Sequence, residues 1–216
     1  MNTKIKATIL ITAALALSGC SLFQSAPETS SDDQVTINPI VDTTTQKQRV
    51  VNTESSSLEW EGSMISGIKT HQGAMGIKEG MLGFNQDNQL VSGSFVIDMN
   101  SMDNFDEEGE MKKVLIEHLK SADFFNVEAH PEARLEITST EVISENNYAV
   151  TADLTIKDIT NSVQFNVEQT ENEFVSEFTI DRTRWDVRFG SNKFFDNLKD
   201  GAISDEIKFN INLITN

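Results

Sequence analysis

Residues 148–156, YAVTADLTI, place apolar side chains at every second position. The positions between them carry mostly threonine and aspartate, so the segment has one dry face and one wet face. A period of two is the pattern of a β-strand in an antiparallel sheet. The dry face consists of Tyr148, Val150, Ala152, Leu154 and Ile156.

The same period recurs along the chain from residue 51 onward, in eight or nine runs. Examples are residues 58–64, 91–99, 163–167 and 207–213, and short polar turn signals separate several of the runs. Strands joined by short turns form hairpins, and closing such a sheet on itself removes its exposed edges. The sequence therefore predicts an all-β fold, a closed antiparallel β-barrel of about eight strands. A barrel of that size holds either a packed interior or one small ligand.

Residues 105–125, FDEEGEMKKVLIEHLKSADFF, follow the helical period instead. Met111, Val114, Leu115, His118 and Leu119 share one face of a helix. Acidic residues gather at its start and lysines lie later, which is the favourable arrangement for the helix dipole. We expect one amphipathic helix, inserted between strands, to pack across an end or a side of the barrel.

The run FTIDRTRWDVRFG, residues 178–190, breaks the alternation of a strand. Phe178 and Ile180 are apolar at even positions, whereas Trp185 and Val187 are apolar at odd positions. A strand alternates faces, so a change of phase predicts a bulge or a tight turn. We expect this turn near a rim of the barrel, with Trp185 returning to the interior.

The N-terminus reads as an export signal with a site for lipid attachment. Residues 1–19 carry Lys4 and Lys6 before a short apolar run, which is typical of a signal peptide. Residues 17–20, LSGC, resemble the lipobox of bacterial lipoproteins, in which the cysteine is acylated. Cys20 is the only cysteine of the chain and is the predicted attachment point. Residue 21 is serine and not aspartate, which favours the outer membrane, facing the periplasm, if the source is Gram-negative.

Three segments follow from these features: a signal peptide at residues 1–19, a lipidated flexible tether at 20–50 and a barrel domain at 51–216. The tether is rich in Ser, Thr, Gln and Asp and shows little periodicity. The chain is thus expected to be exported and anchored to a bacterial membrane through its N-terminal lipid.

Charge and composition exclude several classes of function. The chain has 17 basic and 34 acidic residues, a net charge of −17, which argues against nucleic-acid binding. A single cysteine and three scattered histidines predict no metal site. We find no GxSxG elbow and no phosphate-binding loop with its lysine, so we assign no catalytic residues.

Three stretches resemble the YceI-like family, the lipid- and polyisoprenoid-binding domain. They are HLKSADFFNVEAHPEARLEITS at 118–139, ADLTIKDITNSVQFNV at 152–167, and the phase-breaking run with its continuation to residue 207. The resemblance covers about residues 52–216. It implies a lipocalin-like barrel with an internal tunnel for a long isoprenoid chain, such as a polyprenol or a quinone tail. It supplies no catalytic set.

The phase of each strand selects candidates for the lining of such a tunnel, although each could equally fill a solid core. Arg182 or Arg184, close to the expected rim, could hold a ligand head group through bidentate donors, or pair with a nearby aspartate as a structural residue. The lining candidates are Trp60, Phe95, Ile97, Tyr148, Val150, Leu154, Phe165, Phe178, Trp185 and Phe209.

The sequence therefore predicts a membrane-anchored lipoprotein that binds a long-chain amphipathic lipid in its barrel. No other cofactor is expected, and a homodimer is compatible with the sequence. Two alternatives stay open: an interaction lipoprotein with a solid core and no ligand, and an enzyme acting on a bound lipid. A hollow interior distinguishes the carrier from the solid-core alternative.

Overall fold

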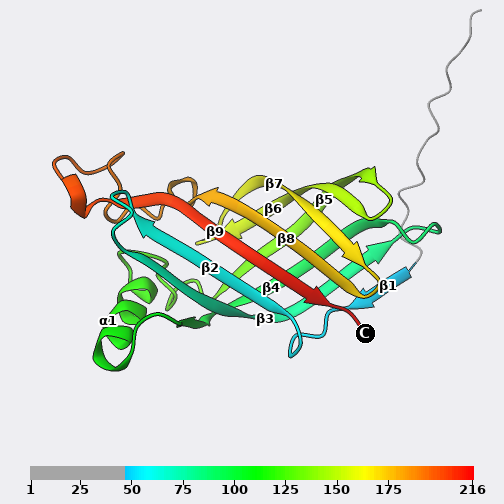
Figure 1. Ribbon diagram of the computed structural model, residues 1–216, viewed down its shortest axis with the longest axis horizontal. Coiled ribbons are helices and arrows are strands. Elements are labelled where there is room, and N and C mark those ends of the chain that lie inside the picture. The colour runs from blue at the N-terminus through cyan, green and yellow to red at the C-terminus, as the bar shows by residue number, and fades with distance from the viewer. Residues whose placement is uncertain (1–46) are drawn as a thin grey trace, which may run out of the picture. The chain divides into compact units, whose positions relative to one another are not determined.

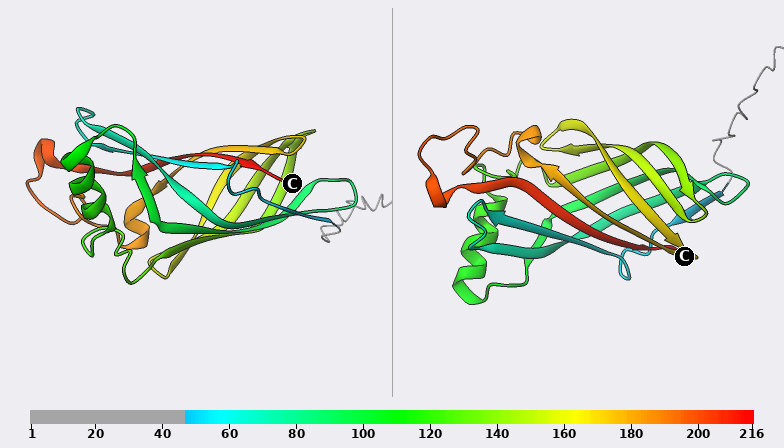
Figure 2. Two further views of the ribbon diagram at one scale, coloured as in Figure 1. Left: turned by 90° about the horizontal axis from the view of Figure 1, so that it is seen from below. Right: turned by 45° about the horizontal axis from the view of Figure 1, so that its top comes forward.

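The computed structural model describes residues 47–216. The predicted signal peptide, Cys20 and residues 21–46 of the predicted tether lie outside the described residues. The described part is a single antiparallel sheet with one α-helix and two short 3-10 helices (Figures 1 and 2). Its elements are β1 (Lys47–Val50), β2 (Ser57–Met64), β3 (Thr70–Phe84), β4 (Leu90–Asn104), α1 (Gly109–Lys120), β5 (Glu132–Ser144), β6 (Asn147–Ile156), β7 (Ile159–Thr170), β8 (Glu173–Asp181), η1 (Arg182–Trp185), η2 (Lys199–Gly201) and β9 (Ile203–Ile214).

The sheet closes on itself. Its strand order is β3-β2-β9-β8-β7-β6-β5-β4, and β4 pairs again with β3. Eight strands therefore form a closed antiparallel barrel, which confirms the predicted fold class. Each strand sends alternate side chains inward, as β6 does with its buried residues at every second position.

The short strand β1 lies next to β2 on the same edge of β3. β1 pairs with Met81–Phe84, and β2 pairs with Thr70–Ala74. The predicted boundary at residue 51 is therefore wrong by four residues, because residues 47–50 belong to the sheet. Their sequence, KQRV, has a single apolar residue, so backbone pairing holds a strand that leaves no period-two signal.

The helix α1 lies at one end of the barrel (Figures 1 and 2), which we call the helix end. It is shorter than the amphipathic stretch that predicted it. Gly109 has a φ of +57° at its start, and the extended Ser121 follows its last residue. None of its residues is fully buried, so it covers the barrel end without entering the core. No helix within residues 47–216 combines the length and the apolar character needed to cross a membrane.

Residues 41–216 form one compact unit. The described part of this unit has a closed sheet and its own apolar core, which are the features of an independently folding domain. We refer to residues 41–216 as the barrel domain, which does not include Cys20.

Gly73 sits where the barrel closes, because β3 pairs there with both neighbours. Its partners are Trp60 in β2 and Asn104 in β4. A Cβ added at Gly73 would lie 1.9 Å from the backbone oxygen of Asp103 and 2.7 Å from the Trp60 ring. The close approach of the strands thus requires a residue without a side chain.

We expect Gly73→Ala to lower the free energy of unfolding of the barrel domain by about 3 kcal/mol, the upper part of the range for overpacking. The matched control is Gly62→Ala in β2, where an added Cβ meets nothing within 4 Å. Urea denaturation of both variants measures the difference. Equal midpoints for the two would contradict this account of the closure.

Candidate functional site

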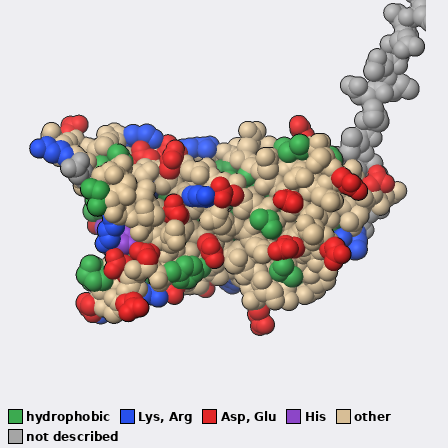
Figure 3. Space-filling model, in the orientation of Figure 1, with side chains coloured by type: hydrophobic (Ala, Val, Ile, Leu, Met, Phe, Trp, Pro, Cys, Tyr) green, Lys and Arg blue, Asp and Glu red, His purple; other side chains and the backbone are tan. Residues whose placement is uncertain are grey.

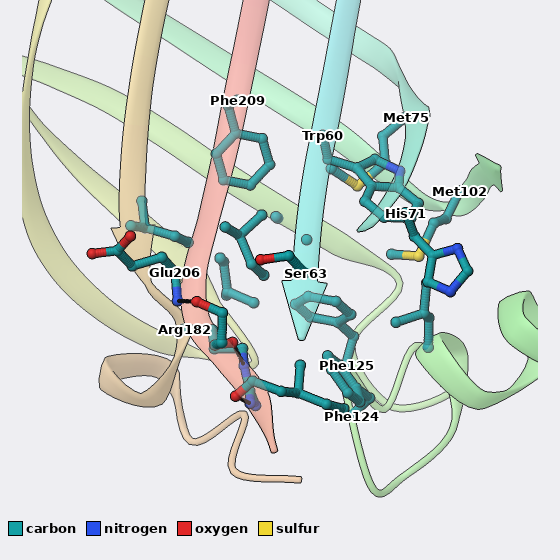
Figure 4. A pocket seen from close by; sticks show the side chains of 18 of the residues that line it. Trp60, Ser63, His71, Met75, Met102, Phe124, Phe125, Arg182, Glu206 and Phe209 are labelled. Carbon is teal, nitrogen blue, oxygen red and sulfur yellow. Dashed lines mark hydrogen bonds between the residues drawn. The ribbon is translucent and has the colours of Figure 1, made fainter. Parts of the chain in front are cut away.

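The barrel interior holds a cavity of about 310 Å³. It is lined mainly by apolar side chains from seven strands, with α1 and the following turn at the helix end. Trp60 and Phe209 lie along its wall, and Phe124 and Phe125 lie near the helix end (Figure 4). The volume is within the range of small-molecule sites. The interior is therefore not filled throughout by the protein's own side chains.

A second, smaller cavity of about 60 Å³ continues the first toward the other end of the barrel. Leu58, Ile97, Leu135 and Ile211 line both cavities, so they form the constriction between the two. A chain-like ligand running along the barrel axis would pass this constriction.

The structure brings most of the predicted lining residues to these cavities. Tyr148, Val150 and Trp185 line neither cavity; Val150 is buried at 1% exposure. Tyr148 is also buried, and its hydroxyl donates to Oε1 of Gln169 at 3.2 Å. The main cavity is lined by Trp60, Ile97, Leu154, Phe178, Arg182 and Phe209, and the smaller one by Phe95, Ile97 and Phe165.

Trp185 explains the predicted break of phase. β8 ends at Asp181, η1 follows, and Asp186 has a left-handed φ of +59° that turns the chain. Trp185 is completely buried, and its Nε1 donates to the backbone oxygen of Leu154 at 2.9 Å. The break is thus a strand end and a tight turn at the helix end, with the indole returned to the core.

Arg182 is the most unusual side chain of this turn, because it is charged and only 1% exposed. Its guanidinium donates to three backbone oxygens: Ser204 at 2.9 Å, Val187 at 2.7 Å and Ile203 at 3.3 Å. Its Nη2 also lies 3.6 Å from Oδ1 of Asp205. Burial lowers the pKa of Arg182, and Asp205 opposes that shift. The arrangement is that of the structural alternative, although the side chain also borders the cavity.

Arg184, the other candidate, points away from the interior. Its guanidinium lies 5.2 Å from the centre of the Trp185 ring and donates to the backbone oxygen of Ser162 at 2.9 Å. It does not line either cavity.

Polar groups gather where the main cavity opens at the helix end. Lys69 pairs with Glu107 at 3.0 Å, and Nδ1 of His71 lies 2.7 Å from Oδ2 of Asp106. Lys69, His71 and Glu206 belong to the cavity lining. The sequence contains no pattern that marks these residues as neighbours, since the barrel brings together residues far apart in the chain.

His71, Asp106 and Glu107 offer ligand atoms that lie within 4.8 Å of one another. Within residues 47–216, these side chains already satisfy each other and their surroundings. Burial alone would raise the pKa of Asp106, but hydrogen bonds from the Gln72 backbone N–H, His71 and Asn104 bring that pKa below its usual value. The group therefore behaves as a polar network, and we assign no metal to it.

Arg182 gives a test of its structural role. We expect Arg182→Met to lower the free energy of unfolding of the barrel domain by about 3 kcal/mol, because it removes a buried cation and leaves carbonyl oxygens without donors. Arg184→Met, the control, should change it by less than about 1 kcal/mol, since its contacts are exposed. Thermal and urea unfolding compare the two. A stable Arg182→Met domain that had lost only ligand affinity would instead assign Arg182 to the head group.

Comparison with known proteins bears out the fold. BcnA of Burkholderia cenocepacia superposes with a TM-score of 0.58 at 19% identity, covering 77% of this chain and 99% of that one. A structure from Saccharophagus degradans, described as a polyisoprenoid binding domain implicated in plant cell wall breakdown, gives 0.53 at 14% identity, covering 77% and 97%. At these identities the likeness concerns the fold.

Similarity in sequence is local in one relative and extends over the domain for the family. A UPF0312 protein of Photorhabdus laumondii is 50% identical over 52 residues, which are 24% of this chain and 26% of that relative. The match thus spans about a quarter of the relative's length. Residues 50–215 match the YceI-like domain, and the chain belongs to that family.

Proposed function

We propose that the protein binds and carries a long-chain isoprenoid lipid, such as a polyprenol or an isoprenoid quinone, in its barrel interior. The observation that carries this proposal is the apolar cavity of about 310 Å³ inside a closed sheet. Removing each methylene of a prenyl chain from water contributes about 0.8 kcal/mol, so a ten-carbon segment supplies several kcal/mol. The proposed role is binding and carriage, without a chemical step.

The polarity of the cavity supports an amphipathic ligand with its head at the helix end. Apolar side chains line the interior, whereas Lys69, His71 and Glu206 border the cavity where it opens. A hydrocarbon tail fits the first environment and a hydroxyl, phosphate or quinone oxygen fits the second. The described relative from Saccharophagus degradans supports the same class of ligand.

The outer surface suits a protein that keeps such a ligand in water. Acidic side chains are spread over the face drawn in Figure 3, and hydrophobic side chains are scattered among them. A net charge of −17 favours solubility of the loaded domain.

We further propose that Cys20 anchors the chain to a bacterial membrane, with the barrel domain facing the periplasm. The signal at residues 1–19 and the LSGC sequence support this placement. Stable anchoring requires more than one acyl chain, which a lipoprotein N-terminus supplies.

The carrier proposal predicts a bound lipid. When the protein is purified from its bacterial host and extracted with organic solvent, mass spectrometry should detect a prenyl lipid at close to one per chain. An extract without such a lipid, repeated after incubation with a prenol, would favour the interaction protein instead.

A cavity-filling variant sharpens this test. Ala133 lines the main cavity, so Ala133→Phe places a ring in the space of the ligand. We expect the retained lipid to fall at least about tenfold, a change of about 1.4 kcal/mol in binding. Ala129→Phe puts the same ring on an exposed turn and should retain the lipid. A thermal unfolding curve for each variant separates lost binding from lost folding.

The anchoring proposal is tested separately. Mass spectrometry of the protein made in a bacterial host should show an N-terminus at Cys20 carrying diacylglycerol, and Cys20→Ser should release the protein from the membrane fraction. An unmodified Cys20 thiol in the mature protein would contradict the proposal and leave the carrier proposal untouched.

A further inference from the structure

The barrel wall is incompletely paired between β7 and β8. The pairs β6–β7 and β8–β9 run in register over ten and nine residue pairs. β7 and β8 pair only through Glu168–Thr170 and Glu173–Val175, next to the turn that joins them. Toward the helix end, the facing edges, residues 159–167 of β7 and 176–181 of β8, are not paired in register. We call this stretch the seam.

Side-chain contacts hold the seam in place of a backbone ladder. Oγ of Ser176 donates to the backbone oxygen of Asn166 at 2.8 Å. At the helix end, Arg184 donates to the backbone oxygen of Ser162, and Nδ2 of Asn161 donates to that of Arg184, both at 2.9 Å. The last two bonds are exposed. Such contacts open at lower free energy than a buried ladder.

Two aromatic rings fill the middle of the seam. Phe165 and Phe178 stack with their centres 4.7 Å apart and their planes 18° apart. Their neighbours in the same inward phase, Val163 and Val167 on β7 and Ile180 on β8, are buried, whereas both rings are half-buried. The pair therefore stands at a gap in the wall.

A groove on the outside of the barrel ends at the same two rings. It has a volume of about 500 Å³ and is lined mainly by outward-facing polar residues of β5 to β8, such as Gln164 and Glu177. Phe165 lines both this groove and the smaller cavity, and Phe178 lines both the groove and the main cavity. The stacked pair is thus the partition between the outside groove and both parts of the interior.

We propose that the seam is a side entrance, through which the hydrocarbon chain passes between the outer groove and the barrel interior when Phe165 and Phe178 separate. This inference rests on the proposed function. A chain loaded only from the helix end must be drawn lengthwise past the constriction at Leu58 and Ile97. A chain that passes the seam meets both cavities directly, because each ring borders one of them.

Locking the seam tests this route. In the barrel domain, which has no cysteine of its own, Asn166→Cys and Glu177→Cys place thiols on the two exposed edges for a short bis-maleimide cross-linker. The probe is geranylgeraniol bearing a fluorescent anthraniloyl group, delivered from phosphatidylcholine vesicles. Its uptake is followed by energy transfer from the two tryptophans.

Cross-linking should slow both uptake and release of the probe at least about tenfold while the equilibrium affinity changes little. The matched control links Glu177→Cys to Asn210→Cys, its registered partner on β9, with the same reagent. This control should exchange the probe at the rate of the unmodified domain. An unchanged rate in the seam-locked domain would overturn the side entrance and leave loading from the helix end.

A second pair of variants opens the seam instead. Phe165→Leu weakens the partition and should speed exchange about threefold or more. Phe174→Leu removes the same ring volume from the smaller cavity, but at a position registered with Gln169, and should not speed exchange. If the unmodified domain fails to take up the probe at all, the carrier proposal itself fails, and the side entrance fails with it.

Discussion

The pairing of β3 with both β2 and β4 is the constraint on which the rest of the structure depends. It closes eight strands into a barrel and fixes the circumference of the interior. At Gly73 the strands approach so closely that no side chain fits, and the Trp60 ring occupies the adjacent space. Once the circumference is fixed, the inward side chains either fill the interior or leave a hollow. Here they leave two hollows in line, separated by the four residues of the constriction.

The helix end shows how a buried charge can shape an opening. Arg182 satisfies carbonyl oxygens of the turn after β8 and of the start of β9, two segments that no regular ladder joins at that point. Trp185 ties the same turn to the end of β6. The guanidinium also lies 5.3 Å from the centre of the Phe124 ring in the turn after α1. One cation and one indole thus fix three parts of the rim, which keeps the cavity mouth in a defined shape.

Period-two alternation was enough to predict the closed sheet, because each strand has one wet and one dry face. It also selected cavity residues such as Ile97 and Leu154. It could not separate these from Tyr148 or Val150, which share the same phase and lie in packed core, since phase gives direction and not the distance to a hollow. The phase break at residues 181–185 was readable as a turn, but the partners of Arg182 come from residues 187 and 203–204 and depend on tertiary structure. Strand β1, with one apolar residue, left no signal.

The seam was hidden from the sequence for a related reason. β7 and β8 each alternate normally, since each has one fully paired neighbour, and the short turn between them predicts an ordinary hairpin. Only the closed geometry reveals that their edges part after three residue pairs. A barrel that paired fully at this place would bury Phe165 and Phe178 as ordinary core. The parted edges instead expose one side of the stacked pair to a polar groove, where water can satisfy the free backbone groups. The wall is therefore weakest where the protein's own aromatic side chains, rather than its backbone, separate the hollow from solvent.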